Sequence, residues 1–264
     1  MTAALGAHSP FLMAHQQKNR RKRKDPAIER KADDLVESTG ISRALAMQVV
    51  LGRVELNEVL TRMAHKAEVE SLMRRYDLSR ALATQITLGQ ADLDSVLFKR
   101  RMAQHLSDNA DRSVLVQAAL DGKPVSLALH GQRGVDGTVL GVDRYEFQFK
   151  PRTGDEETVH KLQAKFAVDA TLRKKVRKSL SYDKERRAAG DVEPVWKPQD
   201  RYTCSNKRLF TFQDQKTPVQ ASLLEGEVLR GVVTWVGRYE FGLEVKGGVE
   251  VVVFRHALAN LTPA

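Results

Sequence analysis

Histidine and cysteine, the side chains most often used for catalysis or metal binding, are scattered through this 264-residue chain without a recognisable pattern. Cys204 has no histidine or acid close by in sequence that would activate a thiolate. A loose phosphate-loop pattern at Gly131, Gly134 and Gly137 precedes an expected strand instead of a helix. Metal-ligand spacing is missing from all seven histidines: His8, His15, His65, His105, His130, His160 and His256. The sequence therefore predicts a protein that is not an enzyme and uses no cofactor or metal.

Charge suggests the kind of partner instead. The chain carries 43 basic and 33 acidic residues, a net charge of +10, which favours polyanions, nucleic acid above all, with anionic membrane as the alternative. A single cysteine excludes a disulfide framework and suits a reducing compartment. No apolar run approaches the ~20 residues that cross a bilayer, and the N-terminus lacks a secretory core. We expect a cytoplasmic protein without a membrane partner.

One string of residues occurs twice. Arg144–Phe147, with the sequence Arg-Tyr-Glu-Phe, recurs 94 residues later as Arg238–Phe241. The same offset relates further pairs: Pro124 and Pro218, Leu129 and Leu223, Gly137 and Gly231, Val139 and Val233. An ungapped repeat of this kind indicates two copies of one β-rich module.

The N-terminal segment 1–26 is predicted to be a disordered basic arm. It contains six cations in the seven residues Lys18–Lys24, which repel one another and cannot be buried together. Such an arm would seek phosphates. A nuclear localisation signal and a plain solvated tail are the alternatives.

Residues 27–106 form a predicted all-α region that is also duplicated. Ser42–Gly52 returns 37 residues later as Ser79–Gly89. In each copy the serine is a favourable N-cap, and the glycine supplies the left-handed residue that ends a helix. We expect two helical hairpins, each with an amphipathic lead-in such as Ile28–Ser38, able to dock another protein.

Each β module is predicted to be a helix followed by five short strands. The first module spans 107–170, with its helix beginning at Ser107, and the second spans 205–264; a basic linker, 171–204, joins them. So few strands bury apolar surface best as a small curled sheet or bent barrel. The expected fold class is therefore α+β, with N-terminal all-α repeats before the two modules.

The second module resembles the bacterial Sm-like RNA chaperones of the Hfq family. Three stretches and one glycine carry the resemblance, the last stretch being the most specific: Thr217–Gly226, Gly231, Arg238–Phe241 and Phe254–Leu258. The resemblance reaches the first module through the repeat and does not extend to the helical half. It implies Sm-like modules, each a helix plus a five-stranded bent β-barrel, that pair strand to strand into rings and bind uridine-rich single-stranded RNA.

The resemblance also implies site residues. Tyr239 would stack a base, with Arg238 in the neighbouring pocket. Arg255, after Phe254 in the motif, would hold phosphate or a base edge, and His256 would donate to the RNA backbone or its terminal hydroxyl. The remaining RNA-binding candidates are the rim cations of the short helix and the retained pair of the first module: Lys207, Arg208, Arg144 and Tyr145.

The chain also departs from the family. Ser222 stands near the place of the aromatic that binds adenine, which makes adenine binding doubtful. The first module reads Lys161–Ala164 without the histidine and inserts acids at 155–157, so a structural role is favoured for it. Tyr145 and Tyr239 could alternatively be ordinary rim aromatics that pack on one side.

The predicted function is that of an Hfq-like RNA chaperone or post-transcriptional regulator that recognises single-stranded, uridine-rich RNA. A homo-oligomer, such as a pseudo-six-membered ring of three chains, is expected. One alternative is a scaffold that uses the modules for assembly and the helical repeats for docking. Another is a DNA-binding regulator, although neither hairpin's second helix has the basic, polar face that reads a groove.

Overall fold

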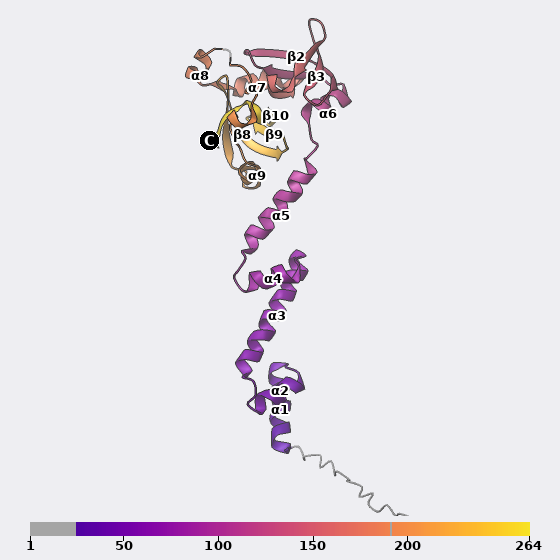
Figure 1. Cartoon of the computed structure of the whole chain (residues 1–264), viewed down its shortest axis with the longest axis vertical. Helices are drawn as coiled ribbons and strands as arrows, with labels where there is room; N and C mark the ends of the chain where they lie inside the picture. Colours follow the sequence, from indigo (N-terminus) through magenta and orange to yellow (C-terminus); the bar gives the residue numbers. More distant parts are fainter. Residues whose placement is uncertain (1–24, 191) are drawn as a thin grey trace, which may run out of the picture. The chain divides into compact units, whose positions relative to one another are not determined.

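The computed structural model describes residues 25–190 and 192–264, and nearly all of the predicted basic arm lies outside the described residues. The described residues divide into two compact units, one ending at Asp92 and the other beginning at Leu93. The first is helical and the second combines helices with an antiparallel sheet, which confirms the α+β class with N-terminal helices (Figure 1). Among the described residues, no helix is both long and apolar enough to span a membrane.

The helices of the first unit keep the 37-residue repeat. The helices of this unit are α1 (Pro26–Thr39), α2 (Arg43–Val50), α3 (Leu56–Tyr76) and α4 (Arg80–Thr87). The predicted caps are confirmed: the hydroxyls of Ser42 and Ser79 accept the N–H groups of Leu45 and Leu82, each at 3.4 Å. By the repeat offset, the second half of the long helix α3 takes the place of α1, so one helix serves both repeats.

The second unit is built on one antiparallel sheet of eleven strands. Its helices are α5 (Leu93–Asp108), α6 (Val114–Asp121), α7 (Arg173–Ser179), α8 (Lys184–Ala188) and α9 (Asn206–Asp214). The first strand set is β1 (Val125–Leu129), β2 (Arg133–Val142), β3 (Glu146–Pro151), β4 (Glu157–His160) and β5 (Ala164–Asp169). The second is β7 (Pro218–Leu223), β8 (Glu227–Val236), β9 (Glu240–Val245), β10 (Val249–Phe254) and β11 (Leu258–Pro263), and β6 (Ser181–Tyr182) pairs with β8.

The two strand sets repeat in detail. Each long second strand carries a bulge at the same repeat position, after Val139 in β2 and after Val233 in β8. A Cβ atom on Gly137 would lie 2.3 Å from the carbonyl oxygen of Lys150, and one on Gly231 would lie 2.2 Å from that of Glu244. Only glycine lets the bent strands approach so closely, which explains why both copies keep it.

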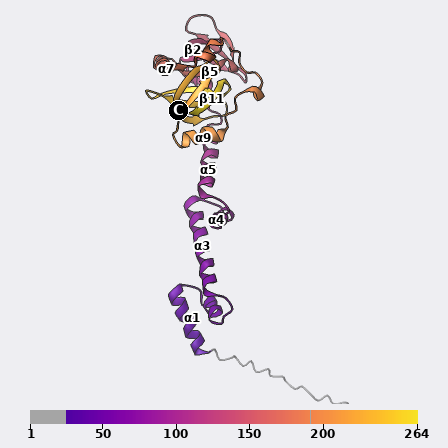
Figure 2. The same cartoon turned by 90° about the vertical axis from the view of Figure 1, so that its left-hand side faces the viewer.

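Neither strand set closes into a barrel of its own, contrary to expectation. The order is β11-β7-β8-β9-β10-β5-β1-β2-β3-β4, so the sheet continues from one module into the next. Figure 2 shows β2 and β5 of the first strand set and β11 of the second within this unit. The joining pair is β10 with β5, with Val252 opposite Ala167 and Val253 opposite Phe166. Phe254 packs in the core of the first module, and Phe166 packs in the core of the second. The two modules therefore share their cores.

Two local expectations were wrong. A helix was expected to begin at Ser107, but α5 continues to Asp108 and the next helix, α6, begins at Val114. The start is fixed by Glu240, whose Oε1 accepts the N–H of Val114 at 2.7 Å. The segment after Thr171 was expected to be only a linker, yet it contains α7, β6 and α8, because Val176 is buried in the core and β6 pairs with β8.

A buried ionic cluster fixes the junction between the modules. The carboxylate of Glu225 accepts the backbone N–H groups of Gly131 at 2.7 Å and Gln132 at 2.9 Å, and it binds the ammonium of Lys165. Lys165 also binds Glu227 and is fully buried. Burial acts to raise the pKa of Glu225, but Lys165 and the two N–H groups together outweigh it, so the pKa is lowered. Losing one member of such a cluster leaves an uncompensated buried charge.

A second buried acid crosses the junction with the opposite balance. Glu240 is 3% exposed, and burial raises its pKa from 4.5 to about 7 despite its bond to the N–H of Val114. Between those two pH values the folded chain holds a proton that the unfolded chain has released. The contribution of Glu240 to stability is therefore complete below pH 4.5 and is lost as the pH rises through about 7.

We predict that Glu240→Gln is more stable than the wild type at neutral to alkaline pH and similar to it in acid. The difference between the two proteins should grow by roughly 3 kcal/mol between roughly pH 5 and pH 8, because glutamine keeps an acceptor but cannot ionise. Urea unfolding at both pH values measures it. Glu146→Gln, the exposed counterpart in the first module, is the matched control and should leave the pH dependence unchanged. Parallel pH profiles for Glu240→Gln and the wild type would contradict the assignment.

Candidate nucleic-acid interface

Two equivalent turns present an arginine and a tyrosine to solvent. One turn joins β2 to β3 and is closed by a hydrogen bond from Asp143 N to Glu146 O at 2.9 Å. The other joins β8 to β9 and is closed by Gly237 N to Glu240 O, also at 2.9 Å. The tyrosines on them, Tyr145 and Tyr239, are 59% and 67% exposed. Neither ring contributes to the core.

In both turns the arginine lies over its neighbouring ring. The guanidinium carbon of Arg238 is 5.2 Å from the ring centroid of Tyr239, and that of Arg144 is 5.1 Å from the ring of Tyr145. This is a cation–π arrangement. A flat aromatic surface beside a cation can stack a nucleobase and attract the adjoining phosphate, and neither interaction requires a particular base.

The Arg255 side chain hydrogen-bonds to the backbone of the second turn. Its Nη1 lies 3.3 Å from the carbonyl oxygen of Gly237 and 3.2 Å from that of Arg238, and 2.7 Å from Oδ1 of Asn206. Its Nη2 donates to the carbonyl of Cys204. Burial lowers the pKa of the guanidinium. Arg255 was expected to hold phosphate or a base edge, but in this structure its donors point at protein oxygens.

Lys161 performs the same task in the first module. Its ammonium donates to the carbonyls of Asp143 and Arg144, the repeat counterparts of Gly237 and Arg238. Burial lowers the pKa of this ammonium as well. The backbone agrees: Lys161 N donates to the carbonyl of Tyr145 at 2.8 Å, and Arg255 N to that of Tyr239 at 2.9 Å. We call each arrangement a cation clamp, in which a semi-buried cation positions an Arg–Tyr turn.

His256 is turned toward the other module. Its Nε2 lies 2.8 Å from the carbonyl oxygen of Ala164 at the start of β5. Burial lowers the pKa of the imidazole to about 4, so it is neutral at physiological pH and Nε2–H is the donor. The ring lies beside Phe254, with the two centroids 5.7 Å apart. The hydrogen bond of His256 therefore joins the two modules. Its contact with RNA stays a prediction.

The other predicted site residues lie in different surroundings. Phe254 is 5% exposed and packs in the core of the first module, where no ligand reaches it. Lys207 and Arg208 are exposed at the beginning of α9. Arg208 donates to the hydroxyl of Tyr202 at 3.0 Å and to the carbonyl of Leu261 at 2.6 Å. The structure thus brings Arg238, Tyr239 and Arg255 together, whereas the Arg208 side chain is bonded to Tyr202 and Leu261.

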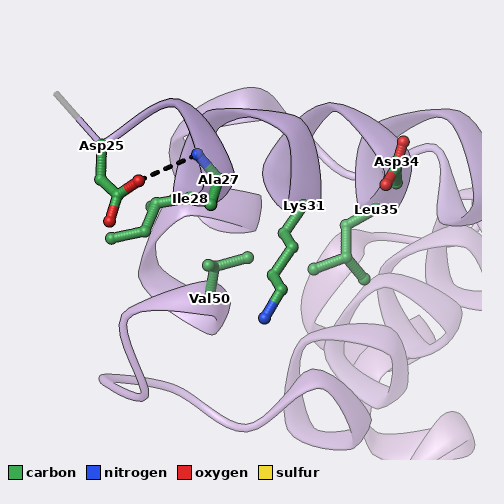
Figure 3. Close-up of a pocket in the computed structure, with 7 residues that line it drawn as sticks. All are labelled: Asp25, Ala27, Ile28, Lys31, Asp34, Leu35 and Val50. Atoms are coloured by element: carbon green, nitrogen blue, oxygen red, sulfur yellow. Dashed lines mark hydrogen bonds between the residues drawn. The ribbon is translucent and has the colours of Figure 1, made fainter.

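Three other features of the described residues concern metal binding, a surface hollow and the lone thiol. They contain no group of three histidine, cysteine or acidic side chains placed to hold a metal ion. A hollow beside α1, lined by Asp25, Lys31, Asp34 and aliphatic residues, is open to solvent (Figure 3). The carboxylate of Asp25 there is occupied as a helix cap, accepting the N–H of Ala27 at 3.0 Å. Burial raises the pKa of the Cys204 thiol, which opposes the thiolate form.

Two features were missed from the sequence. The repeat offset aligns Lys161 with Arg255, and this equivalence was the available signal for the cation clamp. The basic residues after Thr171 were assigned to a linker, and nothing local marks them as part of a folded element. Within α7 the only apolar residue is Val176, among lysines and arginines.

Comparison with known proteins adds little. No family model matches the chain, and no curated protein matches it. Among solved structures, the chain is similar to a crystal structure of the pleiotropic translational regulator Hfq, at 26% identity. The alignment covers 22% of this chain and 93% of that one, with a TM-score of 0.21. At this TM-score the likeness carries no weight, so a function must rest on the chain's own geometry.

We predict that Arg255→Ala destabilises the second module and loosens its turn. Unpaired carbonyls and a lost charged hydrogen-bond network should lower the free energy of unfolding by roughly 2–4 kcal/mol. Arg255→Lys should restore about half of that, because Lys161 holds the equivalent turn with an ammonium. Urea unfolding measures the stability, and the rate of tryptic cleavage after Arg238 reports on the turn. Equal stability and equal cleavage in Arg255→Ala would rule out the clamp.

Proposed function

We propose that this chain is an RNA-binding protein of the Hfq-like kind, a chaperone or post-transcriptional regulator that grips single-stranded RNA. The two strand sets with their helices α6 and α9 are the tandem Sm-like modules of this proposal. The observation that carries it is the duplicated Arg–Tyr turn, with both rings exposed and each placed beside a cation. Uridine-rich RNA is the proposed ligand, because its weakly stacked bases are free to leave one another for the tyrosine rings.

The packing of the turns supports a binding role over a structural one. Large aromatic side chains that serve stability are normally buried, as Phe147 and Phe241 are on the strands that follow the two turns. Tyr145 and Tyr239 stay exposed in both copies, although clamps beneath them hold the turns in place. A preorganised ring of this kind loses little conformational entropy when a base stacks on it.

We predict that Tyr239→Ala weakens the binding of a uridine oligonucleotide by roughly 5- to 100-fold. Loss of one base–aromatic stack costs about 1–3 kcal/mol. Tyr239→Phe keeps the ring and should bind nearly as the wild type does, and Tyr145→Ala measures the share of the first module. Fluorescence anisotropy with a labelled oligonucleotide gives the affinities. An alanine variant that is folded and binds like the wild type would refute the site.

Self-assembly is the second part of the proposal. β10 pairs with β5 within the chain, and their repeat counterparts are β4 and β11, which form the two ends of the sheet. By the 94-residue offset, the same register would set Val159 of one chain opposite Asn260 of another. Such pairing can close a ring, and three chains would supply six modules. It also covers two strand edges that would otherwise invite non-specific association.

The edge of β11 is partly occupied in the single chain. Leu261 donates its N–H to the hydroxyl of Tyr202 at 3.3 Å, and its carbonyl accepts from Arg208 at 2.6 Å. Pairing with another copy has to replace these contacts, so assembly should be reversible. These contacts also offer a way to shift the equilibrium between monomer and oligomer, because the hydroxyl of Tyr202 can be removed without removing its ring.

We predict that the purified protein reaches the mass of three chains in light scattering at high concentration and dissociates on dilution. Tyr202→Phe should shift this equilibrium toward the oligomer, because the edge of β11 loses a competing partner. Thr211→Val serves as a hydroxyl-removing control, because the Thr211 hydroxyl donates to the carbonyl of Lys207 within α9. A monomer at every concentration, in both the wild type and Tyr202→Phe, would exclude the ring.

A further inference from the structure

The net positive charge outside the N-terminal arm lies in one short folded segment. Residues 1–24 contain six cations and no acid, so the remaining 240 residues have 37 cations against 33 acids. The segment Arg173–Gly190, which we call the basic strap, contains eight cations and two acids. Without the strap, residues 25–264 would carry a slight excess of acid. The excess of positive charge in the described residues is therefore concentrated in the basic strap.

The strap is anchored to the second module. Val176 of α7 is 2% exposed and belongs to the core of that module. β6 extends the sheet by pairing Ser181 with Val228. Asp183 N then donates to the carbonyl of Gly226 at 2.8 Å. Gly226 has φ +88°, and a Cβ there would lie 2.8 Å from the carbonyl oxygen of Asp183, so strap and turn are in tight backbone contact. The strap is thus a fixed part of the module.

Anchoring by Val176 directs the neighbouring cations outward. The four residues that flank it in α7 are all exposed: Lys174, Lys175, Arg177 and Lys178. In the described part of the chain, no acid lies within ion-pair distance of any of these four. Only the ends of the strap are paired, Arg173 with Asp136 at 2.6 Å and Arg186 with Asp183 at 3.5 Å. Four cations held close together without counterions form a site for a polyanion.

An aromatic side chain completes the surface. Tyr182 of β6 is 44% exposed, and the guanidinium carbon of Arg187 lies 3.8 Å from its ring centroid. Tyr182 is the only large apolar side chain that the strap exposes. A segment that inserts into a membrane needs several such side chains on one face. Cations with a single aromatic fit the phosphates and bases of a nucleic acid better than a lipid surface.

We propose that the basic strap binds the phosphate backbone of RNA, independently of sequence, as a second contact surface in addition to the Arg–Tyr turns. The inference rests on the proposed RNA-binding function and deepens it. The turns would hold unstacked bases, and the strap would hold the body of the same or another RNA segment. Because every phosphate contact displaces a counterion, the strap should account for much of the salt dependence of binding.

The test replaces Lys174, Lys175, Arg177 and Lys178 by glutamine in the full-length chain. A matched control removes the same charge from four other exposed cations: Arg30, Arg53, Lys66 and Lys99. Both sets are exposed, and unfolding in urea verifies that each variant is folded. Fluorescence anisotropy with a uridine oligonucleotide and with a mixed-sequence RNA gives the affinities between roughly 50 and 200 mM salt.

The strap variant should lose affinity for both RNAs about equally, by tenfold or more at the lower salt, and its plot of log K against log salt should flatten by about 3. The control variant should keep nearly the wild-type slope. A strap variant with wild-type affinity and slope for RNA would overturn the proposal. So would a variant that loses only its binding to phosphatidylserine vesicles, measured by cosedimentation. Tyr239→Ala tests the turns separately, because it should lower affinity at an unchanged slope. Failure of the turns and failure of the strap are therefore distinguishable.

Discussion

The pairing of β10 with β5 is the contact on which the rest of the second unit depends. Left alone, each of these strands would be a free edge, exposing backbone donors and acceptors. Their pairing also exchanges side chains, since Phe254 enters the first core and Phe166 enters the second. Neither module therefore completes its core without the other. The distance between the two Arg–Tyr turns follows from this one junction.

The buried ions at the junction set its geometry more than its strength. Lys165, Glu225 and Glu227 lose their hydration on burial, and mutual attraction can at best balance that cost. Glu225, however, has a defined partner on each side: the ammonium of Lys165 and the N–H groups of Gly131 and Gln132. A shifted register would leave these groups buried and unpaired. The cluster thus selects one alignment of the modules.

Local pattern was enough to predict the strands and the repeat, because alternation and turn residues act over a few positions. Local pattern could not predict the partners of the site residues, because those partners lie far away in the sequence. Arg255 binds the carbonyl of Cys204, 51 residues away, and Lys165 binds Glu225, 60 residues away. The strap was missed for a related reason: Val176 is a single apolar residue, and its burial depends on a core built from the second module.

Because the two modules belong to one chain, they can carry different residues at the positions that form the junction. Glu225 and Glu240 of the second module are buried at the junction, whereas their repeat counterparts are Gly131, a turn residue, and the exposed Glu146. The Arg–Tyr turn has not diverged in this way, and each copy retains a cation clamp beneath it. An exposed tyrosine adds nothing to either core, so packing does not explain why both copies keep it. The ligand contact that we propose accounts for it, and it would act on both turns alike.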